Sequence, residues 1–160
     1  MIIEYQDKYL EDVKELLVEL EEYIVSIDQD HLDQVGENYK EEMALYDLKE
    51  VRENNGKCYL AIEDNHVVGL IMGIVRKYNK EDYLDYKCPK MGVITELIVS
   101  KNVRSKGVGT LLMKNMESYF QSIDCTYLSL EVFAYNEKAI QFYKKQNYHT
   151  RMFHMIKEIK

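Results

Sequence analysis

A short basic turn with two glycines carries the residue types that hold a phosphate group. It reads Arg104-Ser-Lys-Gly-Val-Gly and sets two cations, Arg104 and Lys106, beside Gly107 and Gly109. Glycine has no Cβ, so an anion can come close to the backbone N–H groups there. If a helix begins at this turn, its first N–H groups and its dipole attract an anion further. The turn is therefore expected to bind a phosphate or pyrophosphate.

The turn does not fit either of the commoner phosphate-binding patterns. A P-loop needs Lys and then Ser or Thr directly after its last glycine, whereas Thr110 follows Gly109 without the lysine. A dinucleotide fingerprint needs a third glycine, and Leu112 stands where it would be. An unrelated nucleotide-binding fold is thus disfavoured. The remaining alternative is an ordinary turn before a helix, with no ligand.

The residues on both sides of the turn predict the elements that position it. Residues 91–100 are rich in β-branched and apolar side chains, which indicates a buried strand. Beyond the turn, apolar residues recur at helical spacing from Val108 to Ile123. The turn therefore joins the end of a strand to the start of a helix.

Two segments of the chain resemble the GNAT superfamily of N-acetyltransferases. The first is Arg-x-x-Gly-x-Gly after a strand ending in Leu97-Ile98-Val99, which is similar to the motif that holds the pyrophosphate of coenzyme A in that family. The second is residues 128–148, where Leu-Glu-Val, Asn136 and Tyr143 follow in the same order as in the family. The resemblance covers residues 55–150 well and the preceding part in outline.

The chain departs from the family pattern at two places. Ser105 stands where the turn usually has glycine, and Asn147-Tyr148 stands where the last helix usually ends in Gly-Phe. Serine is small, and asparagine tolerates the left-handed conformation. Neither departure removes the expectation of cofactor binding.

The resemblance implies acetyl-CoA as co-substrate and assigns a set of contact residues. Expected to contact the coenzyme are Leu97, Ile98, Val99, Arg104, Ser105, Lys106, Gly107, Val108, Gly109, Thr110, Asn136 and Tyr143. Asn136 is expected both to cap a helix and to hydrogen-bond the pantetheine arm. A backbone N–H near Val99 is expected to stabilise the charge that develops on the thioester oxygen.

Three side chains are candidates for proton transfer. By resemblance, Tyr143 points at the sulfur and serves as the acid, the alternative being a core aromatic beside Phe142. A base must take the proton of the attacking amine, and Glu131 and Glu96 are equal candidates because each is a carboxylate within an apolar strand. The alternative for each is a solvated or ion-paired strand residue, and catalysis without a dedicated base is also open.

The expected fold is a single α/β domain over residues 1–160, with a central, mixed, mostly antiparallel twisted sheet whose central strands splay apart. Apolar periodicity and turn residues predict the order βααβββαβαβ. The expected strands are residues 1–6, 57–63, 67–76, 91–100, 125–133 and 149–159, and the expected helices are residues 7–27, 38–52, 108–123 and 136–146.

Composition and charge limit the kinds of binding partner that are expected. The net charge is −7, and most of the acidic residues lie in the first half, which disfavours nucleic acid and suits a cationic amine. No apolar run is long enough for a bilayer, so no membrane is expected. The three cysteines and four histidines have no metal-ligand spacing, so no metal is expected, and reduced thiols suit the cytoplasm.

The main hypothesis is direct transfer of an acetyl group from acetyl-CoA to a primary amine of a small cationic substrate. A protein N-terminal or lysine acetyltransferase is the alternative within the class. A non-catalytic acyl-CoA-binding sensor is the alternative outside it. The oligomeric state is open, with a homodimer as the default.

Overall fold

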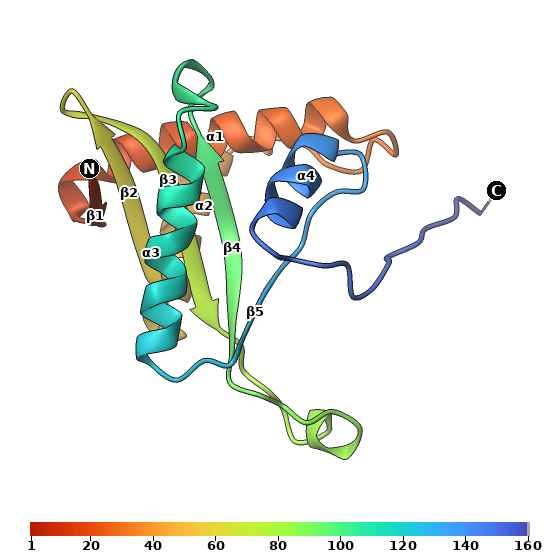
Figure 1. Ribbon diagram of the computed structural model, residues 1–160. Helices are drawn as coiled ribbons and strands as arrows, with labels where there is room; N and C mark the ends of the chain where they lie inside the picture. The colour runs from red at the N-terminus through yellow and green to blue at the C-terminus, as the bar shows by residue number, and fades with distance from the viewer. Residues whose placement is uncertain (160) are drawn as a thin grey trace.

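A five-stranded sheet with helices on both faces forms the body of the protein in the computed structural model, which describes residues 1–159 (Figure 1). Its strands are β1 (Ile2–Glu4), β2 (Lys57–Glu63), β3 (His66–Val75), β4 (Met91–Val99) and β5 (Tyr127–Leu130). Its α-helices are α1 (Leu10–Ile27), α2 (Tyr39–Glu53), α3 (Val108–Ser122) and α4 (Glu137–Lys145). Short 3₁₀ turns occupy Asp7–Tyr9, Asp82–Leu84 and Lys101–Val103.

The sheet is mixed and mostly antiparallel, as the sequence predicts. The strands lie in the order β1-β2-β3-β4-β5, and only β4 and β5 are parallel. The pairing of β4 with β5 stops at Ile94, while β4 continues to Val99 along β3. The predicted splay is therefore confirmed, and it leaves one edge of β4 open over its last residues (Figure 1).

Two hydrophobic layers hold the helices to the sheet. On one face, α1 and α2 bury Val13, Leu17 and Leu48 against residues of β2 and β3. On the other face, α3 buries an apolar stripe that includes Leu112 and Phe120. Burying each such side chain stabilises the fold by roughly 1.5–3 kcal/mol. The amphipathic patterns of α1 and α3 thus fix which side of the sheet each helix covers.

A bulge in β4 changes which face its side chains meet. Met72 lies opposite Glu96 and Gly73 opposite Ile94, so Thr95 is an extra residue without a partner on β3. Without this bulge, Ile94 and Glu96 would lie on the same face, because strand side chains alternate. With it, Ile94 packs in the α3 layer and Glu96 lies on the α1–α2 face beside Met72.

The predicted strand at residues 149–159 is wrong. These residues form neither strand nor helix and run away from the body of the protein (Figure 1). A strand needs a hydrogen-bonded neighbour, and Arg151 instead binds Tyr86 in the loop of residues 77–90. The strand predicted at residues 125–133 is also shorter, because β5 ends at Leu130.

None of the helices within residues 1–159 is both long and apolar enough to cross a membrane.

Candidate active site

The basic turn joins β4 to α3 with two residues in left-handed backbone conformations. Gly107 has φ 83° and precedes the first residue of α3, and the N–H of Leu111 donates to its C=O at 3.1 Å. The N–H groups of Val108, Gly109 and Thr110 lie in the first turn of α3, where a helix has no internal acceptors for them. A Cβ at Gly107 would meet no atom within 4 Å. The turn is therefore an open cradle that a side chain would fill, which fits a pyrophosphate.

Ser105 shares the left-handed conformation, with φ 67°. Glycine adopts this conformation freely, whereas another L-residue loses about 1–2 kcal/mol. Ser105 therefore strains the backbone at a position where the family usually has glycine, and the small size of serine does not remove this strain.

The two cations of the turn are paired with carboxylates. The guanidinium of Arg104 lies 3.3 Å from Oε1 of Glu19 on α1, and its Nε donates to the C=O of Val99 at 2.8 Å. Lys106 Nζ lies 3.8 Å from Glu63 at the end of β2. Both pairs are partly exposed, and such pairs hold together with only about 0–1 kcal/mol. An incoming polyanion can therefore compete for both cations.

The open edge of β4 presents backbone groups beside this turn. The N–H of Ser100 donates to the C=O of Val68 at 2.9 Å, so the backbone of Ser100 faces β3. Successive strand residues direct their backbone groups to opposite sides. The N–H groups of Val99 and Leu97 therefore face the gap left by the splay. This is the position in which the sequence predicts a donor for the thioester oxygen.

Asn136 caps α4, as the sequence predicts. Its Oδ1 accepts from the N–H of Ala139 at 3.2 Å and from the hydroxyl of Tyr23 at 3.3 Å. Tyr23 also lies under the guanidinium of Arg104, 5.8 Å from the ring centroid. One side chain of α1 thus contacts two of the predicted coenzyme-binding residues. The predicted contact of Asn136 with pantetheine stays a prediction.

Glu96 belongs to a group of buried carboxyls between α1, α2 and β4. Burial, and then the charges of Asp47 and Glu21, raise the pKa of Glu96 to about 8. Burial and the charge of Glu50 raise the pKa of Asp47 to about 6, so Asp47 ionises while Glu96 still holds its proton. Burial and the charge of Asp33 raise the pKa of Glu21 as well. The three acids form one partly buried group, in which Asp47 carries negative charge at neutral pH while Glu96 is mostly protonated.

Two tyrosines complete this group. The hydroxyl of Tyr39 donates to Glu21 Oε2 at 3.4 Å. Tyr143 lies on α4, where its ring packs edge-on against Phe142 and Tyr148. Burial, and then the charge of Glu96, raise the pKa of Tyr143 to about 12, so its hydroxyl keeps its proton at neutral pH. Because the charge of Glu96 affects the pKa of Tyr143, the candidate acid and this candidate base lie near each other.

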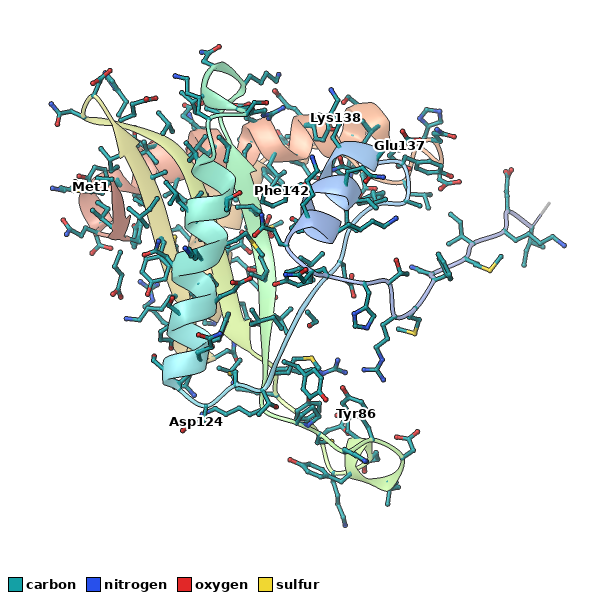
Figure 2. All side chains as sticks on the ribbon, in the orientation of Figure 1. Met1, Tyr86, Asp124, Glu137, Lys138 and Phe142 are labelled. Carbon is teal, nitrogen blue, oxygen red and sulfur yellow. The ribbon has the colours of Figure 1, made fainter. Side chains whose placement is uncertain are left out.

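Phe142 fixes the position of α4 on α3. Phe142 is the side chain labelled beside α4 in Figure 2. A Cβ at Gly109 would lie 3.4 Å from its ring, which means that the ring packs directly on this glycine. Gln146 Nε2 donates to the hydroxyl of Thr110 at 3.3 Å, so a second contact ties the same two helices. The small residue at position 109 therefore serves helix packing, whereas Gly107 faces open space.

Glu131 lies apart from this group. It is exposed and follows the last residue of β5, so the prediction of a carboxylate inside an apolar strand is wrong for this residue. Its catalytic role stays a prediction that mutation can test. Of the two carboxylates proposed as base, Glu96 is the one that the fold brings to Tyr143.

The sequence analysis did not predict the residues that α1 and α2 contribute to the site. Glu21, Asp47, Tyr39, Glu19 and Tyr23 come from α1 and α2, far in sequence from the two motif segments. One signal was available: Asp47 lies between Ala44, Leu48 and Val51 on the buried stripe of α2, where a carboxylate is costly without a function.

Comparison with known proteins supports the family resemblance. The sequence matches the Acetyltransferase (GNAT) family over residues 17–148. It is 36% identical over 94 residues to an uncharacterized N-acetyltransferase of Methanocaldococcus jannaschii, a match that covers 58% of this chain and 53% of that protein. The chain thus spans about half the length of that relative.

Solved structures show the same fold at low sequence identity. A tetramutant of the BH1408 protein from Bacillus halodurans has a TM-score of 0.84 at 16% identity, covering 99% of each chain. A GNAT-family acetyltransferase from Staphylococcus aureus Mu50 has a TM-score of 0.68 at 20% identity, covering 91% of this chain and 82% of its own. The aminoglycoside N-acetyltransferase AAC(6')-Iy in complex with CoA has a TM-score of 0.70 at 11% identity, covering 100% and 99%. With the family match spanning most of the sequence, this chain belongs to the Acetyltransferase (GNAT) family.

Proposed function

We propose that this protein transfers an acetyl group from acetyl-CoA to a primary amine of a small cationic substrate, directly and within a ternary complex. The observation that carries the proposal is the group of three carboxyls, Glu21, Asp47 and Glu96, on the α1–α2 face of β4. The negative charge of Asp47 suits a cationic acceptor. The place of the group next to the open edge of β4 suits a reaction with a thioester held there.

The coenzyme would lie between the basic turn and the open edge of β4. The N–H groups of residues 107–110, Arg104 and Lys106 would hold the pyrophosphate. The backbone of Leu97 and Val99 would pair with the pantetheine arm, with Asn136 on the opposite side of the gap. GNAT proteins use acetyl-CoA as acetyl donor, and the open space at Gly107 supports the same ligand here.

Two side chains would move protons during the transfer. A neutral amine attacks the thioester carbonyl, so a C–N bond forms, the C–S bond breaks and the amine loses a proton. Ionised Glu96 would accept that proton, since its pKa lies near working pH. Tyr143 would give its proton to the departing thiolate, because it is protonated at neutral pH. The N–H of Leu97 or Val99 would stabilise the carbonyl oxygen.

Asp47 and Glu21 would bind positive charge on the acceptor. Oδ2 of Asp47 is buried and, among residues 1–159, has no hydrogen-bond partner. A buried acceptor without a partner costs about 1–3 kcal/mol, which an ammonium donor would recover. This arrangement supports a small acceptor with a second cationic group.

The test is release of thiol from acetyl-CoA with linear diamines, aminoglycosides, amino-acid amides and lysine peptides as acceptors. We expect the diamines or aminoglycosides to react best, and Asp47→Asn to raise KM for them about tenfold with little change in kcat. Leu45→Gln, at an exposed neighbour on α2, is the control and should change neither value. Preference for peptides would favour a protein acetyltransferase and remove the small-amine assignment.

The proposal also includes the domain organisation, the oligomeric state and the compartment of the protein. Residues 1–160 would form one acetyltransferase domain, and two copies would form a homodimer. Cys58, Cys88 and Cys125 are free thiols, which supports a reducing compartment such as the cytoplasm.

A further inference from the structure

The sheet does not join the two segments that are expected to bind the coenzyme. β5 pairs with β4 only as far as Leu130, which lies opposite Ile94. Beyond that point the chain leads through residues 131–136 to α4, while β4 continues toward the basic turn. Within residues 1–159, no hydrogen bond of the sheet therefore holds Asn136 relative to Arg104. Contacts from another element must set how these two side chains lie.

The second half of α1 supplies such contacts, because it lies beside the start of α4 (Figure 1). Glu19 and Tyr23 lie one helical turn apart on the same face of α1. Glu19 Oε1 lies 3.3 Å from the guanidinium of Arg104. The ring centroid of Tyr23 lies 5.8 Å from the same guanidinium, and the Tyr23 hydroxyl donates to Asn136 Oδ1 at 3.3 Å. One ring therefore contacts both segments.

The chain just after α1 gives the same region a fixed support. Asp28 is buried, and its carboxylate accepts the N–H groups of Asp30, Leu32 and Asp33 at 2.6–3.0 Å. These bonds hold the segment after α1 in one conformation. The hydroxyl of Tyr135 donates to Asp30 Oδ2 at 3.5 Å, a weak bond. The end of α1 and the segment after it thus both contact the residues that lead into α4.

The bond from Tyr23 also decides how the amide of Asn136 is turned. A carbonyl oxygen has two lone pairs, and Oδ1 accepts from both the Tyr23 hydroxyl and the N–H of Ala139. The reversed amide would set its Nδ2 donors against the N–H of Ala139, which is unfavourable. The Nδ2 donors are therefore directed to the other side. Pantetheine contains amide carbonyl groups, which accept such donors.

We propose that Tyr23 is a positioning residue for the coenzyme, which turns the amide of Asn136 toward pantetheine and holds the guanidinium of Arg104 for the pyrophosphate. This role rests on the proposed function, since it requires acetyl-CoA as the ligand. The ring of Tyr23 is neutral, so it holds Arg104 without repelling a polyanion. Its two contacts can be separated, because Tyr23→Phe removes only the hydroxyl and Tyr23→Leu removes the ring as well.

The test is calorimetry with CoA and with ADP, because ADP has a pyrophosphate but no pantetheine arm. Tyr23→Phe should weaken CoA binding about fivefold and keep ADP binding within about twofold of wild type, since one neutral hydrogen bond is lost on the pantetheine side only. Tyr23→Leu should weaken both ligands, with a loss of about threefold for ADP, because the contact with Arg104 is lost too. Tyr46→Phe, at an exposed tyrosine of α2, is the matched control and should change neither affinity.

A double-mutant cycle with Asn136→Ser tests whether the hydroxyl acts through Asn136. Serine also caps helices, but it is shorter and has no amide. In that background, Tyr23→Phe should change CoA affinity less than about twofold, because the bond it removes is already absent. Wild-type CoA affinity in Tyr23→Phe, an equal loss for CoA and ADP, or an undiminished loss in the Asn136→Ser background would each overturn the role of Tyr23 and leave the proposed function standing. Absence of CoA binding by the wild-type protein would overturn both.

Discussion

The guanidinium of Arg104, in the turn expected to hold the pyrophosphate, lies 3.3 Å from the carboxylate of Glu19 on α1. Glu19 Oε1 also accepts the N–H of Lys101 at 3.2 Å, so this one carboxylate contacts both ends of the 101–104 segment. A carboxylate in this place has two opposite effects. It holds Arg104 in position, and it adds a negative charge where a polyanionic coenzyme would bind.

For Glu19, we expect the repulsion of the coenzyme to outweigh the positioning of Arg104. Glu19→Gln should tighten acetyl-CoA binding about threefold at low salt, because Arg104 is released and one repelling charge is removed. The gain should shrink as ionic strength rises. Calorimetry at two salt concentrations measures it, with Glu15→Gln as the control, because Glu15 pairs with Lys40 on α2. Weaker binding by Glu19→Gln would mean that positioning of Arg104 dominates.

The two glycines of the turn should respond differently to substitution. Gly107→Val should abolish detectable acetyl-CoA binding, a loss of at least about 100-fold, because its side chain would occupy the open cradle and strain a φ of 83°. Gly109→Ala places its methyl group in ordinary contact with Phe142, so binding should stay within about threefold of wild type. Equal losses in both variants would argue against the assignment of the cradle.

Ser105 should be improved by glycine. Ser105→Gly removes the strain of φ 67° but adds freedom to the unfolded chain, so the free energy of unfolding should rise by about 0.5 kcal/mol. Ser100 has φ −50°, and Ser100→Gly should instead lower the free energy of unfolding by about 0.5–1 kcal/mol. Urea denaturation of both variants checks the signs. A decrease for Ser105→Gly would show that the serine side chain stabilises the turn.

Glu96 should impose opposite pH effects on activity and stability. If it is the base, kcat/KM, corrected for the neutral fraction of the amine, should rise with pH to a plateau above about 8. Its pKa is raised above the 4.5 of the unfolded chain, so the folded state binds more protons between these values. Stability should therefore fall as pH rises from 4.5 through 8.

The variant Glu96→Gln separates these effects. It should lose most turnover, and its kcat/KM should no longer rise with pH. At pH 8 it should unfold at a higher urea concentration than wild type, and this difference should vanish near pH 4. Glu131→Gln is the control, since Glu131 is exposed, and it should keep the wild-type profile. A normal profile for Glu96→Gln would remove Glu96 as base.

Tyr143→Phe should lower kcat about 100-fold and change acetyl-CoA affinity less than about threefold, because only the hydroxyl that protonates the thiolate is lost. Single-turnover kinetics and calorimetry give the two values. Tyr148→Phe removes a neighbouring buried hydroxyl that has no partner among residues 1–159, so it should leave kcat unchanged. Wild-type turnover by Tyr143→Phe would leave it only a packing role.

The sequence by itself was enough to predict the four helices, most of the strands and the basic turn between β4 and α3. Helical and strand periodicity reflect which side chains are apolar, and the two glycines and two cations of residues 104–109 lie within one short local segment. The capping of α4 by Asn136 was also local, and it is confirmed. Predictions of this kind succeed because the interactions that decide them lie within a few residues of each other.

Two other features depend on tertiary packing. They are the preference for Glu96 over Glu131 as the proposed base and the conformation of residues 149–159. Glu96 and Glu131 occupy similar sequence contexts, and they were separated by the bulge at Thr95 and by the early end of β5. Asp47 and Glu21 join Glu96 because α1 and α2 pack on that face of the sheet. A strand at residues 149–159 depends on a neighbour to bond with, and no pattern in the segment itself specifies that neighbour.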